Sequence, residues 1–260
     1  MKRVFVFLSV VLAAIVAFPD AQFREVINDN GEVKGLCTSI LGQDNERNTQ
    51  LNESITSELR STALYRNYIG YWKIQNDSLF LDSLLIYRTG RHNLSKMELG
   101  NLYASLKTPT GYFVNWLTDT LRITSGNLVR YEHWLWNSTW ENEEFVTVNR
   151  GIVTGRTSKH NKLINPQMND ADILKLVKNL DLGEIPKRIV LRLVYSGFDN
   201  NGQPTGLNIE VVRSCGDSTI DKRVVSAIDS AFMIHKPFPI YLIDGKYETV
   251  TWLIPINKRD

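Results

Sequence analysis

Residues 188–260 constrain the fold most, because patterns typical of a strand, a turn, a strand, a helix and a final strand follow one another there without interruption. Val and Leu dominate residues 189–195, and apolar and polar residues alternate over 207–213, which indicates two strands. Asn201-Gly202 between them favours a tight hairpin turn, because both residue types accept positive φ angles. The segment therefore predicts a β-hairpin as the start of a small domain.

An amphipathic helix is expected to follow the hairpin, with Asp217 or Ser218 as its capping residue. Its apolar positions recur at helical spacing and comprise Ile220, Val224, Ala227, Ile228 and Ala231. Asp244-Gly245 then turns the chain into a predicted last strand over residues 247–257. The expected product is a small β-β-α-β domain in which one helix can cover only one face of the sheet.

The last strand of this domain is a candidate contact surface. Pro255 favours an edge position for it, because a proline has no N–H to donate within a central ladder. An unpaired edge invites aggregation unless a partner uses it, and adding a peptide strand to such an edge is a known mode of recognition. No pattern of a catalytic site occurs in residues 188–260, so we expect a binding module and not an enzyme. The predicted partner-binding residues of the edge strand are Tyr247, Thr249, Thr251 and Leu253.

Several short motifs in this segment occur together in one known family. They are Asn201-Gly202, Val211 to Gly216, Ile220-Asp221, Ala227-Ile228, Phe232 and Ile254-Pro255-Ile256. With them, residues 188–257 resemble the TonB C-terminal domain. The resemblance implies a periplasmic α+β domain that pairs an edge strand with a short peptide near the N-terminus of an outer-membrane transporter. The family's central motif corresponds here to Arg213, Ser214, Gly216 and Asp221.

The chain also departs from that family. Cys215 stands where the family pattern has the second Ser of a pair, and the eight Pro are scattered instead of gathered in a long linker rich in Pro and Lys. An energy transducer of the family needs such a linker and a membrane anchor. The resemblance therefore implies a TonB-like domain that binds an envelope protein or peptide, with a membrane-anchored energy transducer as an alternative.

The N-terminus has the pattern of an export signal. Lys2 and Arg3 precede an uncharged, mostly apolar run from Val4 to Phe18, which is shorter than the ~20 residues of a typical membrane span. Residues 1–21 are therefore predicted to be a signal peptide with Ala21 as a cleavage position, and an uncleaved anchor is the alternative. Either case places the body of the protein in the periplasm or cell envelope, with membrane attachment only if the segment is retained.

Residues 22–156 have the pattern of a β domain, because short alternating segments are separated by turn residues. They predict an antiparallel β-rich domain built as a sheet, a sandwich or a small barrel, with one short helix over 52–65. Residues 157–183 are expected to be a polar interdomain linker and a helix that Gly183 ends. The TonB-like domain then occupies 184–260, which makes the whole chain α+β.

An aromatic cluster is the best candidate for chemistry or ligand binding in the first domain. His133 lies among carboxylates on a predicted strand over 128–136, but neither a nucleophile nor metal-ligand spacing accompanies it, so acid–base catalysis is the weaker interpretation. The aromatic rings of Trp134, Trp136 and Trp140 can instead stack on a sugar. A carbohydrate-binding or hydrolytic β domain with an accessory C-terminal module is thus the second hypothesis, and Trp side chains that fill a β core are the simpler alternative.

The cysteines and the charge limit the remaining possibilities. Export permits a disulfide between Cys37 and Cys215, which would tie the two domains together, and two unpaired, partly buried thiols are the alternative. Neither Cys has a second ligand at metal-site spacing, so no metal site and no cofactor are predicted. A formal net charge of +2 without a run of Lys or Arg argues against nucleic acid as a partner, whereas exposed edge strands also allow a homodimer.

Overall fold

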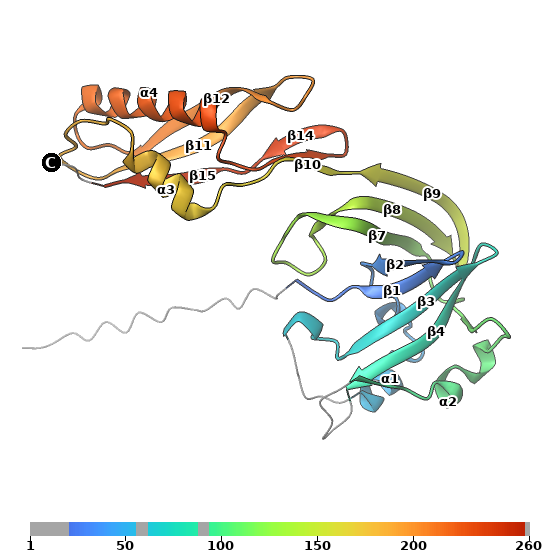
Figure 1. Cartoon of the computed structure of the whole chain (residues 1–260). Helices are drawn as coiled ribbons and strands as arrows, with labels where there is room; N and C mark the ends of the chain where they lie inside the picture. The colour runs from blue at the N-terminus through green and yellow to red at the C-terminus, as the bar shows by residue number, and fades with distance from the viewer. Residues whose placement is uncertain (1–20, 56–61, 88–93, 258–260) are drawn as a thin grey trace, which may run out of the picture.

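The computed structural model describes residues 21–55, 62–87 and 94–257, and it contains two domains with separate hydrophobic cores (Figure 1). Among the described residues, strands make up 46% and helices 21%, which confirms the α+β class. The predicted signal peptide or anchor, apart from Ala21, lies outside the described residues. The domains meet at Asn161, between the last strand of the first domain and the first strand of the second.

One curved sheet organises the N-terminal domain. Its strands follow the order β3-β1-β2-β7-β8-β9-β4-β5 with β6 on β4, and β3 also pairs with β4, so the sheet closes on itself. The pairs are antiparallel as predicted, except for the parallel pair of β1 and β3. The strands are β1 (Glu25–Asp29), β2 (Glu32–Leu36), β3 (Tyr68–Gln75), β4 (Ser78–Tyr87), β5 (Leu94–Lys96), β6 (Tyr112–Phe113), β7 (Asp119–Arg130), β8 (Thr139–Asn149) and β9 (Ile152–His160).

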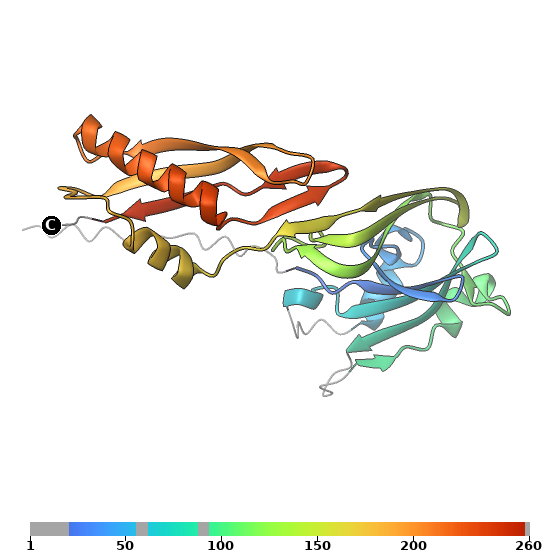
Figure 2. The same ribbon diagram turned by 45° about the horizontal axis from the view of Figure 1, so that its top comes forward.

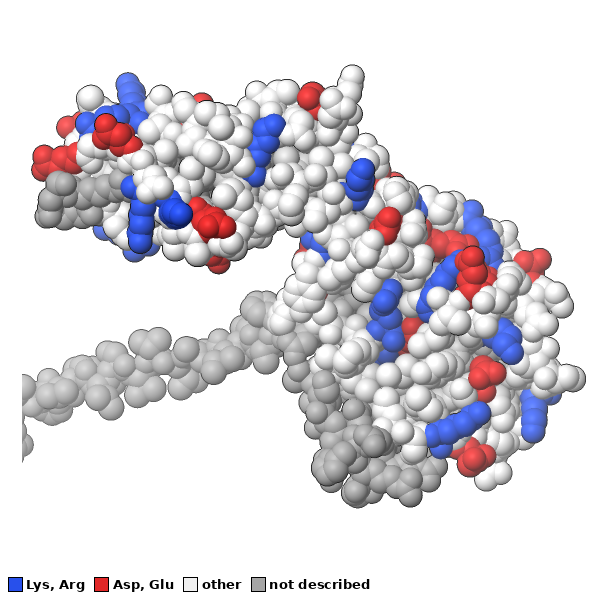
Figure 3. Space-filling view, viewed as in Figure 1, with Lys and Arg blue, Asp and Glu red and all other residues white. Residues whose placement is uncertain are grey.

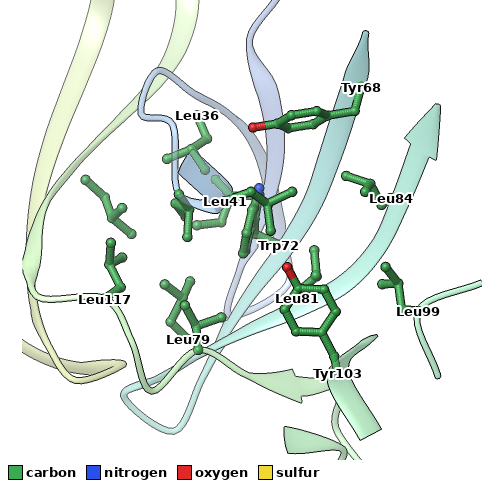
Figure 4. Close-up of a cluster of buried hydrophobic side chains, with 14 of the residues drawn as sticks. Leu36, Leu41, Tyr68, Trp72, Leu79, Leu81, Leu84, Leu99, Tyr103 and Leu117 are labelled. Atoms are coloured by element: carbon green, nitrogen blue, oxygen red, sulfur yellow. The ribbon is translucent and has the colours of Figure 1, made fainter. Parts of the chain in front are cut away.

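The core of this domain is shared by strands and by the segments between them. In β3 the buried residues Tyr68, Trp72 and Ile74 alternate with half-exposed neighbours. Figure 4 shows Trp72 and Tyr103 among leucines from several of these segments. The short helices of the connecting segments are η1 (Leu41–Gln43), α1 (Asn48–Ser54), η2 (Thr62–Leu64), α2 (Gly100–Tyr103) and η3 (Ala104–Leu106).

Two small antiparallel sheets build the C-terminal domain, one in the order β12-β11-β15 and the other in the order β10-β13-β14. Helix α4 lies along one face of the first sheet in both ribbon views (Figures 1 and 2). Asp217 caps α4 as predicted, because its side chain accepts hydrogen bonds from the backbone N–H groups of Thr219 and Ile220. The elements are β10 (Lys162–Asn165), α3 (Asp170–Lys178), β11 (Ile189–Phe198), β12 (Pro204–Arg213), α4 (Ser218–His235), β13 (Ile240–Ile243), β14 (Lys246–Thr249) and β15 (Trp252–Ile256).

Three predicted segments differ in the structure. Residues 157–160 continue β9 and residues 162–165 form β10, so the expected linker is strand; β9 is mostly exposed, and its polar residues resembled a loop. The strand predicted over 128–136 ends with β7 at Arg130, and a loop with positive φ at Leu135 follows. The helix predicted over 52–65 is limited to the end of α1 and to η2, with residues 56–61 outside the described ranges.

The last strand also differs, because the segment predicted as one strand over 247–257 is split between the two sheets. β14 pairs with β13, whereas β15 pairs with β11, and residues 250 and 251 separate them. The cause is β13, which the sequence analysis missed. The predicted turn at Asp244-Gly245, with positive φ at both residues, joins β13 to β14 as a hairpin and draws the first half of the segment away from β11.

A small polar joint connects the domains. Asn161 is fully buried; its side-chain N–H donates to the backbone oxygen of Trp140 at 2.8 Å, and its Oδ1 accepts from the backbone N–H of Asp244 at 3.1 Å. Lys159 pairs with the Asp244 carboxylate at 2.8 Å. The tip of the β13–β14 hairpin is therefore held against the end of the first domain's sheet.

Candidate functional site

The outer edge of β15 is the part of the C-terminal sheet that corresponds to the predicted contact surface. β15 pairs with β11 over five positions, and in the part of the chain that the structure describes no strand pairs with its other side. Leu253 is 59% exposed, whereas Ile254 and Ile256 on the opposite face are buried in the core. The strand is thus anchored by one face and one edge, and the remaining edge is open.

The position of Pro255 indicates which backbone groups face that edge. Pro255 lies opposite Val190 of β11 and has no N–H to donate to it. The N–H and C=O of a strand residue point to one side of the strand, and the side alternates from residue to residue. Pro255 suits a position directed away from β11, and Leu253, two residues earlier, is directed the same way. The N–H and C=O of Leu253 are therefore assigned to the open edge.

The other residues predicted for this edge have different surroundings. The ring of Tyr247 packs against Phe198 with centroids 5.5 Å apart, and its hydroxyl donates to the backbone oxygen of Asn200 at 3.1 Å. The hydroxyl of Thr249 donates to the backbone oxygen of Pro239 at 2.9 Å. Thr251 is exposed but lies between the two strands. The four residues therefore do not form a single contact strand: Tyr247 and Thr249 stand in β14, the outer strand of the other sheet, and Leu253 stands in β15.

The family-like motif shapes the connection from β12 to α4. Arg213 is the exposed last residue of β12, and Gly216 has a φ of 97°, which favours glycine. The hydroxyl of Ser214 accepts from the N–H of Gly216 at 2.8 Å, and the buried carboxylate of Asp221 accepts from the N–H of Cys215 at 3.2 Å. Desolvation acts to raise the pKa of Asp221, but hydrogen bonds from Ser214 and Cys215 outweigh it and leave that pKa lowered. These residues stabilise a turn and place α4.

A groove that the sequence analysis missed lies beside this connection, between β12 and α4, with a volume of about 640 Å³. Its apolar floor comes from alternate residues of β12, and its other wall comes from α4. The signal in the sequence was Val225, an apolar residue that does not belong to the set recognised as the core-facing side of the helix. The groove and the edge of β15 lie at opposite ends of the same three-stranded sheet.

The three Trp residues proposed for ligand stacking do not form one platform. Trp136 and Trp140 line a cavity of about 270 Å³, whereas Trp134, 46% exposed, is not among the described residues that line it. The guanidinium of Arg24 lies 3.5 Å from the ring centroid of Trp140 and covers one of its faces. A ligand in this cavity would therefore meet the rings of Trp136 and Trp140 without Trp134.

The loop that carries Trp134 also carries the histidine considered for catalysis. The Tyr131 hydroxyl lies 3.0 Å from Nδ1 of His133, and both side chains are exposed. Within the described ranges, no group of three or more His, Cys, Asp or Glu residues is arranged to hold a metal ion. Among the helices of those same ranges, none combines the length and the apolar character needed to cross a membrane.

The possible disulfide does not form, and the two cysteines lie in different domains. Cys37 and Cys215 are both buried and unpaired with each other. Cys37 Sγ lies 3.7 Å from the hydroxyl of Thr124, and burial raises the pKa of its thiol. Cys215 packs in the core of the C-terminal domain. The alternative of two buried thiols is the one that the structure supports.

A buried acid with a strongly raised pKa lies in the N-terminal domain, and the sequence analysis did not single it out. Glu25 is fully buried; it accepts a hydrogen bond from the Trp72 indole, and its other oxygen lies 3.3 Å from Nε of Arg66. Desolvation raises the pKa of Glu25 to about 7, although Arg66 and Trp72 both act to lower it. The sequence feature that could have indicated the burial of Glu25 was its place in a short alternating strand, in which Glu25, Ile27 and Asp29 share the inward face.

Comparison of the chain with protein-family models, with curated proteins and with solved structures found no match.

Proposed function

We propose that this protein is an exported cell-envelope protein whose C-terminal domain binds an extended peptide of a protein partner by adding it as a strand to β15. An outer-membrane transporter is the partner class that the TonB resemblance implies. The observation that carries the proposal is the open edge of β15, with an exposed Leu253 and its backbone groups assigned outward. The proposed role is recognition and involves no covalent chemistry.

The arrangement of the domain supports this proposal. β15 is the last strand, it lies at the edge of the order β12-β11-β15, and α4 connects the hairpin to it by way of β13 and β14. Strands β11 and β12, helix α4 and strand β15 follow one another in the order expected for the domain, with the β13–β14 hairpin inserted before β15, and this order supports the proposal. The core residues Ile254 and Ile256 hold the strand in place, so a peptide would meet an edge that is already formed.

The charge distribution favours recognition through the backbone. Formal net charge is +2, and Figure 3 shows basic and acidic side chains interspersed over the visible face of the N-terminal domain. Long-range electrostatic attraction therefore contributes little, and we expect partner binding to depend only weakly on salt.

The test uses the mature full-length chain with a substitution that removes one outward N–H. Leu253→Pro should lower the amount of envelope protein captured from an extract by about tenfold or more, since strand addition depends on main-chain hydrogen bonds. Leu253→Thr, which keeps the N–H and suits a strand, should retain capture. Equal capture by the Pro variant, or recovery of no envelope protein by the unmodified chain, would contradict the proposal.

Two other functions remain as proposals. A membrane-anchored energy transducer requires residues 1–21 in the mature protein, and mass spectrometry of the mature N-terminus decides between retention and cleavage. A carbohydrate-binding role for the first domain is favoured only by the cavity that Trp136 and Trp140 share. Unchanged Trp fluorescence across a panel of glycans would remove that support.

A further inference from the structure

The groove between β12 and α4 has the form of a strand-binding site. Helix α4 lies beside β12 in both ribbon views (Figures 1 and 2). The groove between them has a volume of about 640 Å³. The side chains of β12 that line it are half-buried, and the polar residues of the helix form its rim. Its lining consists of Leu207, Ile209, Val211, Ser218, Asp221, Lys222, Val225, Ser226 and Asp229.

The outer edge of β12 offers backbone groups at the same residues. Arg192 of β11 lies opposite Leu253 and is therefore directed away from β15, toward its other partner Glu210 on β12. The alternate residues of β12 then direct their N–H and C=O groups outward, and no strand pairs with that edge in the described part of the chain. The outward residues are also the apolar floor of the groove: Leu207, Ile209 and Val211.

The dimensions fit a short extended segment. From Leu207 to Val211 a strand advances ~13 Å at ~3.3 Å per residue. From Ser218 to Asp229 a helix advances ~16 Å at ~1.5 Å per residue. Both walls therefore span about four or five residues of an extended chain, and a floor with side chains at every second position matches the side-chain period of such a chain.

The two charges of the rim determine in which order an extended occupant carries its own charged side chains. The carboxylate of Asp221 accepts a hydrogen bond from the N–H of Cys215. Lys222 and Asp229 are therefore the charged groups of the rim that are left for an occupant. Because α4 returns antiparallel to β12, Lys222 lies toward the Val211 end of the groove and Asp229 toward the Leu207 end. An occupant that runs antiparallel to β12 would place an acidic side chain first, an aliphatic one over Val225, and a basic one last.

We propose that this groove binds an extended peptide segment of a second protein, aligned antiparallel to β12, with an acidic, an aliphatic and a basic residue at alternate positions facing α4. The site is separate from the proposed edge of β15, and the two proposals can fail independently. A sheet with both edges in use would hold two extended segments with three strands between them, ~19 Å apart at ~4.8 Å per strand spacing.

The probe is a labelled peptide, Thr-Glu-Thr-Val-Thr-Lys-Thr, whose charged and Val side chains share one face. Its binding to the full-length chain is measured by fluorescence anisotropy against the charge-exchanged peptide Thr-Lys-Thr-Val-Thr-Glu-Thr. We expect the first peptide to bind at least about tenfold more tightly, and the double variant Lys222→Glu/Asp229→Lys to reverse that preference.

Two further variants locate the binding. Ser226→Arg fills the rim at an exposed helix position, so the fold should persist while affinity falls by about tenfold or more. Leu253→Pro on the other edge is the matched control and should leave the affinity for this peptide unchanged. Binding that survives Ser226→Arg, that is lost with Leu253→Pro, or that shows no preference between the peptides would overturn the proposal.

A second copy of this chain is the competing occupant. Sedimentation of the full-length chain would then show a dimer that Ser226→Arg dissociates, with no binding of either peptide. That outcome assigns the groove to self-association and overturns the proposal of a peptide from another protein.

Discussion

The two domains treat strand edges and buried charge in opposite ways. The sheet of the N-terminal domain closes through the pairing of β3 with β4, whereas the C-terminal sheet β12-β11-β15 leaves both outer edges open. The first domain buries ionisable side chains such as Glu25, Asp29 and Glu143, whereas in the second domain Asp221 is the buried acid among the described residues. The closed sheet suits a stable scaffold, and the open sheet suits recognition.

The largest expected effect tests whether the two cores are independent. Trp72 is 2% exposed in the first core, and Phe232 is fully buried in the second. Trp72→Ala should lower the free energy of unfolding of the N-terminal domain by about 3–5 kcal/mol, and Phe232→Ala should do the same to the C-terminal domain. Hydrogen exchange resolved by domain measures both. If either substitution weakens both domains equally, the cores unfold as one cooperative unit and the comparison fails.

The next effect concerns the pH dependence of the first domain. The pKa of Glu25 is about 7 in the folded state and about 4.3 in an unfolded chain, so between these values the folded state binds the proton that the unfolded state has lost. The free energy of unfolding of the N-terminal domain should therefore fall by roughly 4 kcal/mol as the pH rises through that window.

Denaturant titrations from pH 4 to pH 8 measure this slope. Glu25→Gln should remove it, at the cost of leaving Arg66 without its carboxylate. The C-terminal domain should show no such slope, because the lowered pKa of Asp221 places its effect at lower pH and gives it the opposite sign. A slope that persists in the Gln variant would show that another group titrates.

A third, smaller effect compares ion pairs of the two domains. Arg156 holds the buried Asp29 carboxylate through contacts of 2.7 and 3.0 Å, whereas Arg192 and Glu210 form an exposed pair at 2.6 Å. Arg156→Met should cost about 1–3 kcal/mol, because the buried Asp29 carboxylate loses both Arg156 contacts and keeps the longer Lys34 contact at 3.4 Å. Arg192→Met should cost well under ~1 kcal/mol.

The stability of the protein at acidic pH tests the role of the Arg156–Asp29 ion pair. Burial acts to raise the pKa of Asp29, and Arg156 and Lys34 outweigh it, so that pKa is lowered. The stabilisation is present above the unfolded pKa and is lost as the pH falls through the folded one. The difference between Arg156→Met and the unmodified chain should therefore shrink in acid. A difference that is constant with pH would assign the effect to packing.

The smallest effect tests the joint between the domains. Asn161→Ala removes the partners of the Trp140 carbonyl and the Asp244 N–H and should cost about 1 kcal/mol. Amide exchange at the tip of the β13–β14 hairpin should accelerate, while exchange in the two cores stays unchanged. Lys159→Ala, which removes only a partly exposed ion pair, should have less effect. Faster exchange in β11 would contradict a local role.

Alternating patterns and turn residues predicted much of this fold. Gly202 has a positive φ in the first predicted turn, Asp244 and Gly245 both have one in the second, and Asp217 caps α4. What failed was the assignment of partners, because strand pairing depends on contacts distant in sequence. The whole of segment 247–257 has the pattern of a strand, yet its first half, β14, pairs with β13. Nothing within the segment indicates this division.

The candidate sites were predictable to a smaller degree. Leu253 followed from Pro255 and the edge argument, but the backbone direction of each strand required the register with β11. The groove required knowing that α4 lies over β12 and not over β15, which no spacing within the helix decides. Glu25 was missed because the alternation of a short strand places it on one face with Ile27 and Asp29 but does not show that this face is buried, and its partner Arg66 is distant in the sequence.

Each domain contains one buried, unpaired thiol, and the rate at which that thiol is chemically modified reports how often the domain opens. Cys37 is 9% exposed in the first domain and Cys215 is 4% exposed in the second, so each reacts with a thiol reagent only when its own domain opens. Pulse labelling of the unmodified protein, followed by peptide mass analysis, therefore yields two opening rates from one sample. Those rates report how often the closed scaffold and the open recognition sheet each leave the folded state, without any added probe.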